Sequence, residues 1–283
     1  MSPMNDASLR DRAKNLAKKT GVSPQAVLQM HLLERFLARI AKSAYVDKVV
    51  LKGGMLIASM AGIAQRTTMD MDATVVGMLM SEDAVKSMIE DVCAMAADDG
   101  IEYSPDRIED IREEDEYPGF RAHIGVRLGK IRTIVKIDIT TGDSLVPGAM
   151  RYPYKPILGE EPIPILSYAP ETVIAEKFET IVRRGRFNGR ARDFYDVVLM
   201  LRLHEKTLDW EALAAAIQAT ARRRGSDKAL NAWRSTLEAV RTSGYIRHTI
   251  WEPYADANLY AANITIDDAI EACITIGGRV KLR

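Results

Sequence analysis

Two aspartates that follow a glycine pair are the residues of this chain whose types and spacing best suit chemistry. Gly53 and Gly54 end a short β-branched run, and residues 66–72 read Arg-Thr-Thr-Met-Asp-Met-Asp. Side chains alternate between the faces of a strand, so Asp70 and Asp72 share one face about 6.6 Å apart at the backbone. Carboxylate oxygens are ligands for hard cations such as Mg²⁺. The spacing predicts a divalent-cation site, with a solvated edge strand as the alternative.

A glycine turn that leads from a strand into a helix favours phosphate binding beside that cation site. Residues 56–61 are predicted as a short helix, whose first backbone N–H groups are free to hold an anion. Phosphate and metal together indicate nucleotide chemistry, and a third carboxylate would complete a two-metal site. Asp138 is the candidate, because the alternation of residues 131–140 puts it on the polar face with Lys136. An ordinary ion pair with Lys136 or Arg132 is equally compatible.

The elements that position these residues alternate between strand and helix in the first half of the chain. Helical spacing over 6–43, with Ser23-Pro24 as a start signal, predicts an N-terminal helical preface. Further elements are expected as a strand at 69–76, a helix at 81–97 and a hairpin of 123–128 and 131–139. Residues 142–167 are rich in Pro and Gly, and helical spacing follows from 170. We therefore expect an α/β domain over 1–165 and an all-helical domain over 166–283.

Composition excludes several classes of protein. The 283 residues suffice for about two domains, and 47% hydrophobic with 28% charged residues exclude a disordered or fibrous chain. The 39 basic and 39 acidic residues cancel, so a polyanion has to bind a local patch. Cys93 and Cys273 lie outside C-x-x-C spacing, which favours a reducing cytoplasm. With no run of about 18 apolar residues, we expect a cytoplasmic protein and no membrane partner.

A lysine within an apolar helix face is a second unusual feature. The helix predicted at 170–184 places Lys177 in its apolar arc, and Glu176, Glu179 and Thr180 on the opposite side. Burial of an ammonium group is costly unless an anion meets it, and a phosphate would do so. A lysine that extends its amine to water is the alternative.

The following helix, predicted at 190–201, is apolar nearly all round apart from Asp193 and Asp196. Acids in a first helical turn also stabilise the helix dipole and pair with nearby cations, here Arg190 or Arg192. Structure alone is therefore a sufficient explanation for both aspartates at this point.

Between these helices, residues 183–192 contain five arginines, Phe187 and no acid. Such a loop binds nucleotide or RNA phosphates, with the aromatic ring free to stack on a base. A solvated loop balanced by residues 106–116, which hold seven acids and two arginines, is equally compatible. The acidic stretch itself is interpreted as a solvated edge or loop. The four histidines lack ligand spacing, and hydrolase and P-loop motifs are absent.

The glycine pair, a short helix and Arg-x-Thr-x-Asp-x-Asp resemble the nucleotidyltransferase superfamily, and specifically the AbiEii-like toxins of type IV toxin–antitoxin systems, including the MenT group. The resemblance spans about 49–201 and implies a nucleotidyltransferase-type mixed sheet core. Many members have Gly-Ser at the glycine pair, so backbone N–H groups would replace the serine hydroxyl here. The resemblance implies that Asp70 and Asp72 hold Mg²⁺ and a nucleoside triphosphate, and that nucleotide contacts come from Gly53, Gly54, Arg66, Thr68 and Lys177.

Ala-Glu-Lys at 175–177, followed by Arg-Asp-x-x-Asp, is similar to later motifs of the same family, in which a lysine and an aspartate are needed for activity. This similarity implies that Lys177 contacts the triphosphate and that Asp193 orients a substrate hydroxyl or acts as general base. Asp196 is the alternative to Asp193, because the intervening loop leaves the register loose.

The resemblance also implies a reaction and a biological role. A nucleotide would pass from the triphosphate to RNA at the 3′ end of tRNA, which blocks aminoacylation, translation and growth. A cognate antitoxin is implied, although type IV antitoxins need not bind their toxins. Two alternatives stay open: a small-molecule or protein side-chain acceptor, as in aminoglycoside nucleotidyltransferases, and a catalytically silent protein that holds RNA or a partner.

Overall fold

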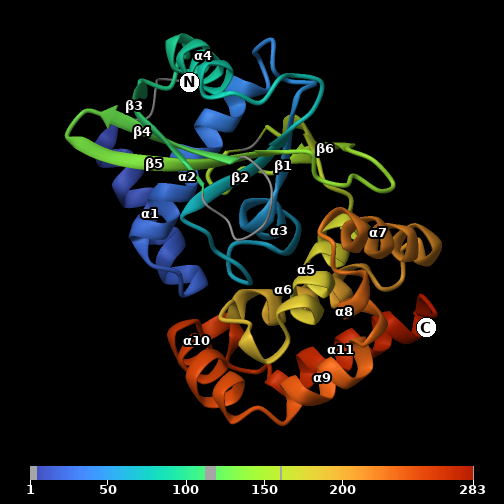
Figure 1. Cartoon of the computed structure of the whole chain (residues 1–283). Coiled ribbons are helices and arrows are strands. Elements are labelled where there is room, and N and C mark those ends of the chain that lie inside the picture. Colours follow the sequence, from blue (N-terminus) through green and yellow to red (C-terminus); the bar gives the residue numbers. More distant parts are fainter. Residues whose placement is uncertain (1–4, 112–118, 160, 283) are drawn as a thin grey trace. The chain divides into compact units, whose positions relative to one another are not determined.

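The computed structural model describes residues 5–111, 119–159 and 161–282. Contacts within the chain divide it into two compact units. One contains the residues up to Gly142 together with Met150–Ser167, and the other contains Asp143–Ala149 and the residues from Tyr168 onward. The first unit carries a β-sheet, whereas the second is helical in its described part (yellow to red in Figure 1).

Two helices precede the sheet, α1 (Asp6–Thr20) and α2 (Pro24–Ile40). The second begins where the sequence indicates, because the Ser23 side chain accepts a hydrogen bond from the Ala26 N–H at 3.1 Å and a proline opens the first turn. The predicted helical preface is confirmed.

The sheet is mixed and has seven strands in the order β3-β4-β5-β2-β1-β7-β6. Its strands are β1 (Val49–Lys52), β2 (Asp70–Val75), β3 (Glu102–Asp110), β4 (Gly119–Leu128), β5 (Ile131–Thr141), β6 (Met150–Tyr154) and β7 (Ile163–Ser167). Helices α3 (Gly53–Ala61) and α4 (Glu82–Ala94) follow β1 and β2. Strand β2 is antiparallel to β1 and parallel to β5. The predicted α/β class, with a helical C-terminal part, is confirmed.

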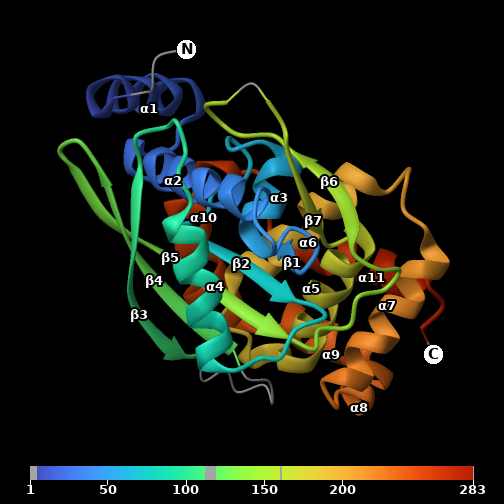
Figure 2. The same ribbon diagram turned by 90° about the horizontal axis from the view of Figure 1, so that it is seen from above.

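One face of the sheet is apolar and carries the core of this unit. On β2 this face consists of Met71, Ala73 and Val75, all buried. Helices α2 and α4 lie across the sheet (Figure 2). On this face the Tyr103 ring of β3 meets the Phe36 ring of α2 edge-on, with centroids 5.2 Å apart. The charged side chains of β2 therefore project from the opposite face.

Two expectations about the sheet need revision. Strand β2 has a neighbour on each side, so an edge strand does not explain its aspartates. The Pro- and Gly-rich segment 142–167 contributes two strands, β6 and β7, in which Pro153 stands opposite Pro164. The acidic stretch lies partly outside the described residues. Its described part follows edge strand β3 to Asp110 and is mostly exposed, in agreement with the interpretation as a solvated edge or loop.

The helical unit is built around α5 (Pro170–Arg184), which contacts both α6 (Ala191–His204) and α7 (Trp210–Arg223). The remaining elements are η1 (Gly185–Phe187), α8 (Asp227–Asn231), α9 (Trp233–Arg241), η2 (Tyr245–Trp251), α10 (Glu252–Ala257), η3 (Leu259–Ala261) and α11 (Ile266–Arg279). Among the helices described, none has both the length and the apolar character that a bilayer crossing needs.

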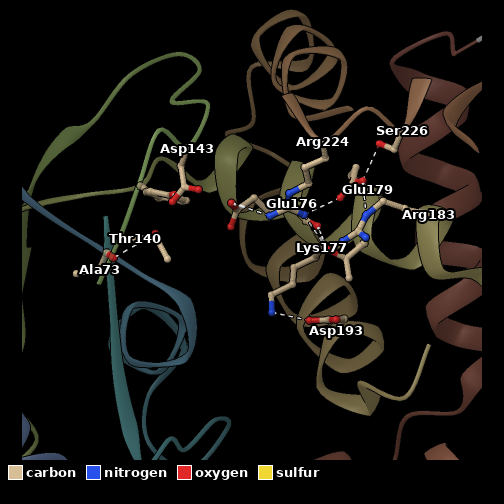
Figure 3. Close-up of polar contacts among 12 residues, drawn as sticks. Ala73, Thr140, Asp143, Glu176, Lys177, Glu179, Arg183, Asp193, Arg224 and Ser226 are labelled. Atoms are coloured by element: carbon tan, nitrogen blue, oxygen red, sulfur yellow. Dashed lines mark hydrogen bonds and ion pairs between the residues drawn. The ribbon is translucent and has the colours of Figure 1, made fainter. Parts of the chain in front are cut away.

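The polar side of α5 is covered by other parts of the helical unit, so that Glu179 and Thr180 are buried. Glu179 Oε1 accepts from Arg183 Nε at 3.0 Å and from Ser226 Oγ at 2.7 Å, and its Oε2 accepts from Arg224 at 2.6 Å (Figure 3). This network joins α5 to the turn between α7 and α8. An amphipathic pattern cannot reveal such a cover, because Arg224, which helps to satisfy the buried carboxylate, lies 45 residues further along the chain.

Candidate active site

Asp70 and Asp72 lie half-buried on the polar face of interior strand β2. In the described part of the chain, no side chain forms a hydrogen bond or ion pair with the Asp70 carboxylate. Two like charges held two residues apart on an interior strand repel each other and lose hydration unless a cation approaches. Their position therefore suits a site that receives a cation.

Strand pairing places Asp138 of β5 directly beside Asp72 of β2. Arg121 of β4 stands opposite Asp138 on its other side and donates to both carboxylate oxygens, Nε to Oδ1 at 2.7 Å and an Nη to Oδ2 at 2.7 Å. The partner of Asp138 is therefore Arg121, and not Lys136 or Arg132 as the sequence suggested. The sequence contains a signal for this pairing that the expected strand at 123–128 left out. The alternation of buried and less buried residues along β4 begins at residue 120, and it places Arg121 on the polar face.

The turn at Gly53 and Gly54 lies in close contact with Asp72. Gly53 adopts a left-handed conformation with φ of 66°, and a Cβ atom there would lie 2.1 Å from Asp72 Oδ2. The Gly54 N–H, at the start of α3, donates to the same oxygen at 3.4 Å. Only glycine fits at position 53, both for its backbone conformation and for the space available.

Arg66 and Thr68 are buried beside Gly54. A Cβ atom on Gly54 would lie 3.0 Å from Thr68 Oγ1 and 3.2 Å from an Arg66 Nη. The Thr68 hydroxyl bonds to the backbone of Asp70, and the Arg66 guanidinium donates to the Thr67 carbonyl. The structure thus gathers all four residues expected to contact nucleotide on this unit around the start of α3.

The donor atoms at β2 are chemically suited to a hard divalent cation, because carboxylate oxygens are the usual protein ligands of Mg²⁺. In residues 5–111, 119–159 and 161–282, no group of three His, Cys, Asp or Glu side chains is arranged to hold one metal ion. Asp70 and Asp72 are the pair that would hold it. A metal role for Asp138 stays a prediction.

The residues expected on the helical unit also come together. Lys177 Nζ lies 2.7 Å from Asp193 Oδ1 and 3.1 Å from Asp196 Oδ2 (Figure 3 shows the first contact). Arg190 Nε lies 3.2 Å from Asp193 Oδ2, as helix-start pairing predicted. Burial by itself lowers the pKa of Lys177, but the two carboxylates outweigh it and raise that pKa above its ordinary value. The Lys177 amine is therefore neutralised by internal acids instead of extending alone into water, and 15% of the side-chain surface stays accessible.

Some arginines of the arginine loop, defined here as residues 183–192, form ion pairs within the protein, and others are exposed. Arg183 is bound to Glu179 and Arg190 to Asp193. Arg186 and Arg192 are exposed, and the described residues include no ion-pair partner for either. The Phe187 ring is 75% exposed, and the Arg186 guanidinium lies 5.0 Å from its centroid. The loop thus presents two unneutralised cations and one exposed aromatic ring.

Comparison with known proteins places these observations in a family. Among solved structures, the chain is similar to JHP933 from Helicobacter pylori, with 16% identity, a TM-score of 0.49 and 92% of each chain covered. It is also similar to an antigenic nucleotidyltransferase-like protein from Paracoccidioides brasiliensis, with 13% identity, a TM-score of 0.42 and coverage of 75% of this chain and 93% of that one. No curated protein matches.

The model of the nucleotidyl transferase AbiEii toxin family, of type IV toxin–antitoxin systems, matches residues 35–271. This range includes the glycine turn, both β2 aspartates and the Lys177 cluster. The match extends over well more than half of the chain, so the chain belongs to the AbiEii family of nucleotidyltransferase toxins.

Proposed function

We propose that this nucleotidyltransferase transfers nucleotides from a nucleoside triphosphate to the 3′ end of tRNA in a Mg²⁺-dependent reaction, and so blocks translation and growth. The observation that carries the metal-dependent part is the pair Asp70 and Asp72 on an interior strand, with the Gly53 turn pressed against Asp72. An acceptor hydroxyl oxygen attacks the α-phosphorus, the bond to the β-phosphate oxygen breaks, and pyrophosphate leaves.

In this proposal each candidate site residue of the sheet unit has a defined role. Asp70 and Asp72 hold the cation, which supplies charge neutralisation at the phosphates. The N–H groups of Gly53 and Gly54 at the start of α3 bind a phosphate, as helix N-termini do, and the Gly54 N–H gives up its 3.4 Å hydrogen bond to Asp72 Oδ2 to do so. Arg66, buried against Gly54, adds positive charge there, and Thr68 fixes the backbone of Asp70.

On the helical unit we assign Lys177 to the triphosphate and Asp193 to the acceptor hydroxyl, with Asp196 as the alternative for the second role. The family supports this assignment, and so does the exposure of Lys177, whose side chain is 15% accessible while both aspartates are buried. An ammonium group held by two carboxylates remains charged at neutral pH, as a phosphate ligand must.

The arginine loop supports RNA as acceptor. Arg186 and Arg192 offer charge to a phosphate backbone, and Phe187 offers a face on which an unpaired base stacks. Since the chain as a whole has a net charge of zero, such a local patch is where a polyanion would bind. We place the reaction in the cytoplasm, in keeping with the free thiols of Cys93 and Cys273, and a cognate antitoxin is implied by the family.

The first experiment identifies nucleotide and acceptor together. Purified protein is incubated with Mg²⁺, total cellular RNA and each α-labelled nucleoside triphosphate in turn, and labelled RNA is separated on a gel. We expect label in the tRNA band with one or more of the triphosphates. Asp70→Ala and Asp72→Ala should each lower labelling at least 100-fold, because the cation loses one of its two protein carboxylates.

The matched control is Glu90→Gln, which removes an exposed negative charge from α4 and should leave labelling unchanged. Full labelling by Asp70→Ala would refute the metal site. Triphosphate binding without any labelled RNA would move the acceptor to a small molecule or a protein side chain. RNA binding without metal-dependent triphosphate binding would indicate a catalytically silent protein.

A further inference from the structure

The strongest contact beside the β2 aspartates is made by a residue that the proposed mechanism does not use. Arg121 donates two 2.7 Å hydrogen bonds to Asp138, one to each carboxylate oxygen. Such a planar two-point contact is the strongest form of charge-assisted hydrogen bond in proteins. The side chains are 35% and 17% exposed, so water screens the pair less than it would screen a surface pair.

The position of this pair is as informative as its strength. Asp138 stands in register with Asp72 on one side and with Arg121 on the other, so the three side chains form a row across β2, β5 and β4. Adjacent strands are about 4.8 Å apart, and two carboxylates at that spacing repel each other. Arg121 removes this repulsion by neutralising Asp138.

We propose that Arg121 takes the place of a second divalent cation at Asp138, so that this chain holds a single protein-bound metal ion through Asp70 and Asp72. The inference rests on the proposed function, because it concerns the metal site assigned there. Arg121 is a positioning residue in this scheme and acts through Asp138.

The physical reason is competition between two kinds of cation for one carboxylate. A dication at Asp138 would have to displace a guanidinium that already engages both oxygens, or share the carboxylate with it against charge repulsion. The hydrogen bond with Asp138 raises the pKa of Arg121 further above its ordinary value, so the guanidinium does not lose its charge at any working pH.

The test counts metal ions rather than turnover. Mn²⁺ is titrated into the full chain without nucleotide and free Mn²⁺ is measured by electron paramagnetic resonance. We expect the wild type to bind one Mn²⁺ per chain. Arg121→Gln should bind two, because Asp138 becomes available beside Asp72. Arg121→Lys restores the positive charge and should bind one.

Two further variants keep the test decisive if Arg121→Gln does not fold. Asp138→Asn should bind one Mn²⁺ with an affinity within about threefold of the wild type, since Asp138 is not a ligand in this scheme. The matched control is Arg127→Gln, because Arg127 is an exposed arginine on β4, the strand of Arg121, and is paired with Glu102 of β3. This variant should also bind one Mn²⁺.

The outcomes separate this inference from the proposed function. Two Mn²⁺ ions on the wild type, or a tenfold loss of affinity in Asp138→Asn, would overturn the role of Arg121 and leave the β2 metal site standing. A wild-type chain that binds no Mn²⁺ would remove both. One Mn²⁺ that persists in Asp138→Asn and is lost in Asp70→Ala supports both.

Discussion

At the scale of single residues, Gly53 is where backbone and site depend on each other most directly. A Cβ atom there would overlap Asp72 Oδ2, and the left-handed φ of 66° is costly for any other residue. We predict that Gly53→Ala moves the Asp72 carboxylate, lowers transfer at least 100-fold and weakens Mn²⁺ binding at least tenfold. Initial rates and Mn²⁺ titrations measure these effects.

Gly77 provides the control, because it has the same φ of 66° and a Cβ atom there would meet nothing within 4 Å. Gly77→Ala should cost about 1 kcal/mol of stability from the strained backbone and leave metal binding intact. If both alanine variants lose activity equally, backbone strain and not the overlap with Asp72 is the cause.

The buried aspartates beside Lys177 pose a second question at this scale, because each could serve structure or function. Lys177→Met leaves two buried carboxylates without their ammonium partner and should cost about 3–5 kcal/mol as well as activity. We predict that Asp193→Asn lowers transfer at least 100-fold and Asp196→Asn less than tenfold, at similar melting temperatures. Thermal melts and initial rates test this pair.

The reverse order of activities would assign the acceptor-binding role to Asp196, and losses that follow stability in both variants would make both structural. The raised pKa of Lys177 stabilises the fold fully below its ordinary value of 10.5, and this stabilisation is lost only as the pH rises through the folded-state value. A change in activity between pH 6 and pH 9 is therefore not due to Lys177.

At the scale of elements, a buried glutamate joins α2 to strand β6 and the segment that follows it. Glu34 accepts from Tyr154 Oη at 3.0 Å and from the Ile157 N–H at 3.0 Å. Burial raises the pKa of Glu34 to about 8, against the opposing effect of these hydrogen bonds. The folded protein then holds a proton that the unfolded chain has released, so stability falls as the pH rises from 4.5 to 8.

The effect of Glu34 on stability is best measured between pH 6.5 and pH 8, where His31 does not oppose it. Below this range, His31 acts oppositely, because burial lowers the pKa of His31 to about 4 and stability rises with pH until 6.5. We predict that the wild type loses roughly 2 kcal/mol between pH 6.5 and pH 8, and that Glu34→Gln loses much less. Urea unfolding at four pH values measures both slopes, and parallel slopes would contradict the role of Glu34.

Helices that begin with a capping residue were predictable from the sequence. Two strands whose formation depends on pairing with each other were not. Ser23 caps α2 and Ser81 caps α4 as their sequences indicate, because capping needs only neighbouring residues. Strands β6 and β7 were missed because Pro153 and Pro164 read as strand breakers, although they stand opposite each other in the hairpin. The burial of Glu179 on α5 depends on the α7–α8 turn, which no pattern within α5 indicates.

At the scale of the whole molecule, a net charge of zero makes RNA affinity depend on a few local cations. We predict that Arg186→Gln with Arg192→Gln lowers the slope of log Kd against log salt by about 1.4, since each phosphate contact on a single strand contributes about 0.7. Phe187→Ala should weaken binding without changing this slope. Filter binding to tRNA at four salt concentrations gives both quantities.

Lys206→Gln with Lys228→Gln is the matched control, because it removes the same charge from exposed positions elsewhere on the helical unit. An equal change of slope in this control would show that the arginine loop is not a distinct RNA site.

Alternation and motif spacing are local properties, so the sequence predicted the α/β and helical parts and the position of Asp70 and Asp72 on one face of a strand after a glycine turn. Strand order was needed to show that β2 is interior, that Asp138 stands beside Asp72, and that Arg121 pairs with Asp138. Helix packing was needed in the same way for Lys177, whose two counterions come from the next helix. Which charge neutralises a buried carboxylate or ammonium depends on strand order and helix packing, and neither is encoded in the spacing of residues along one element.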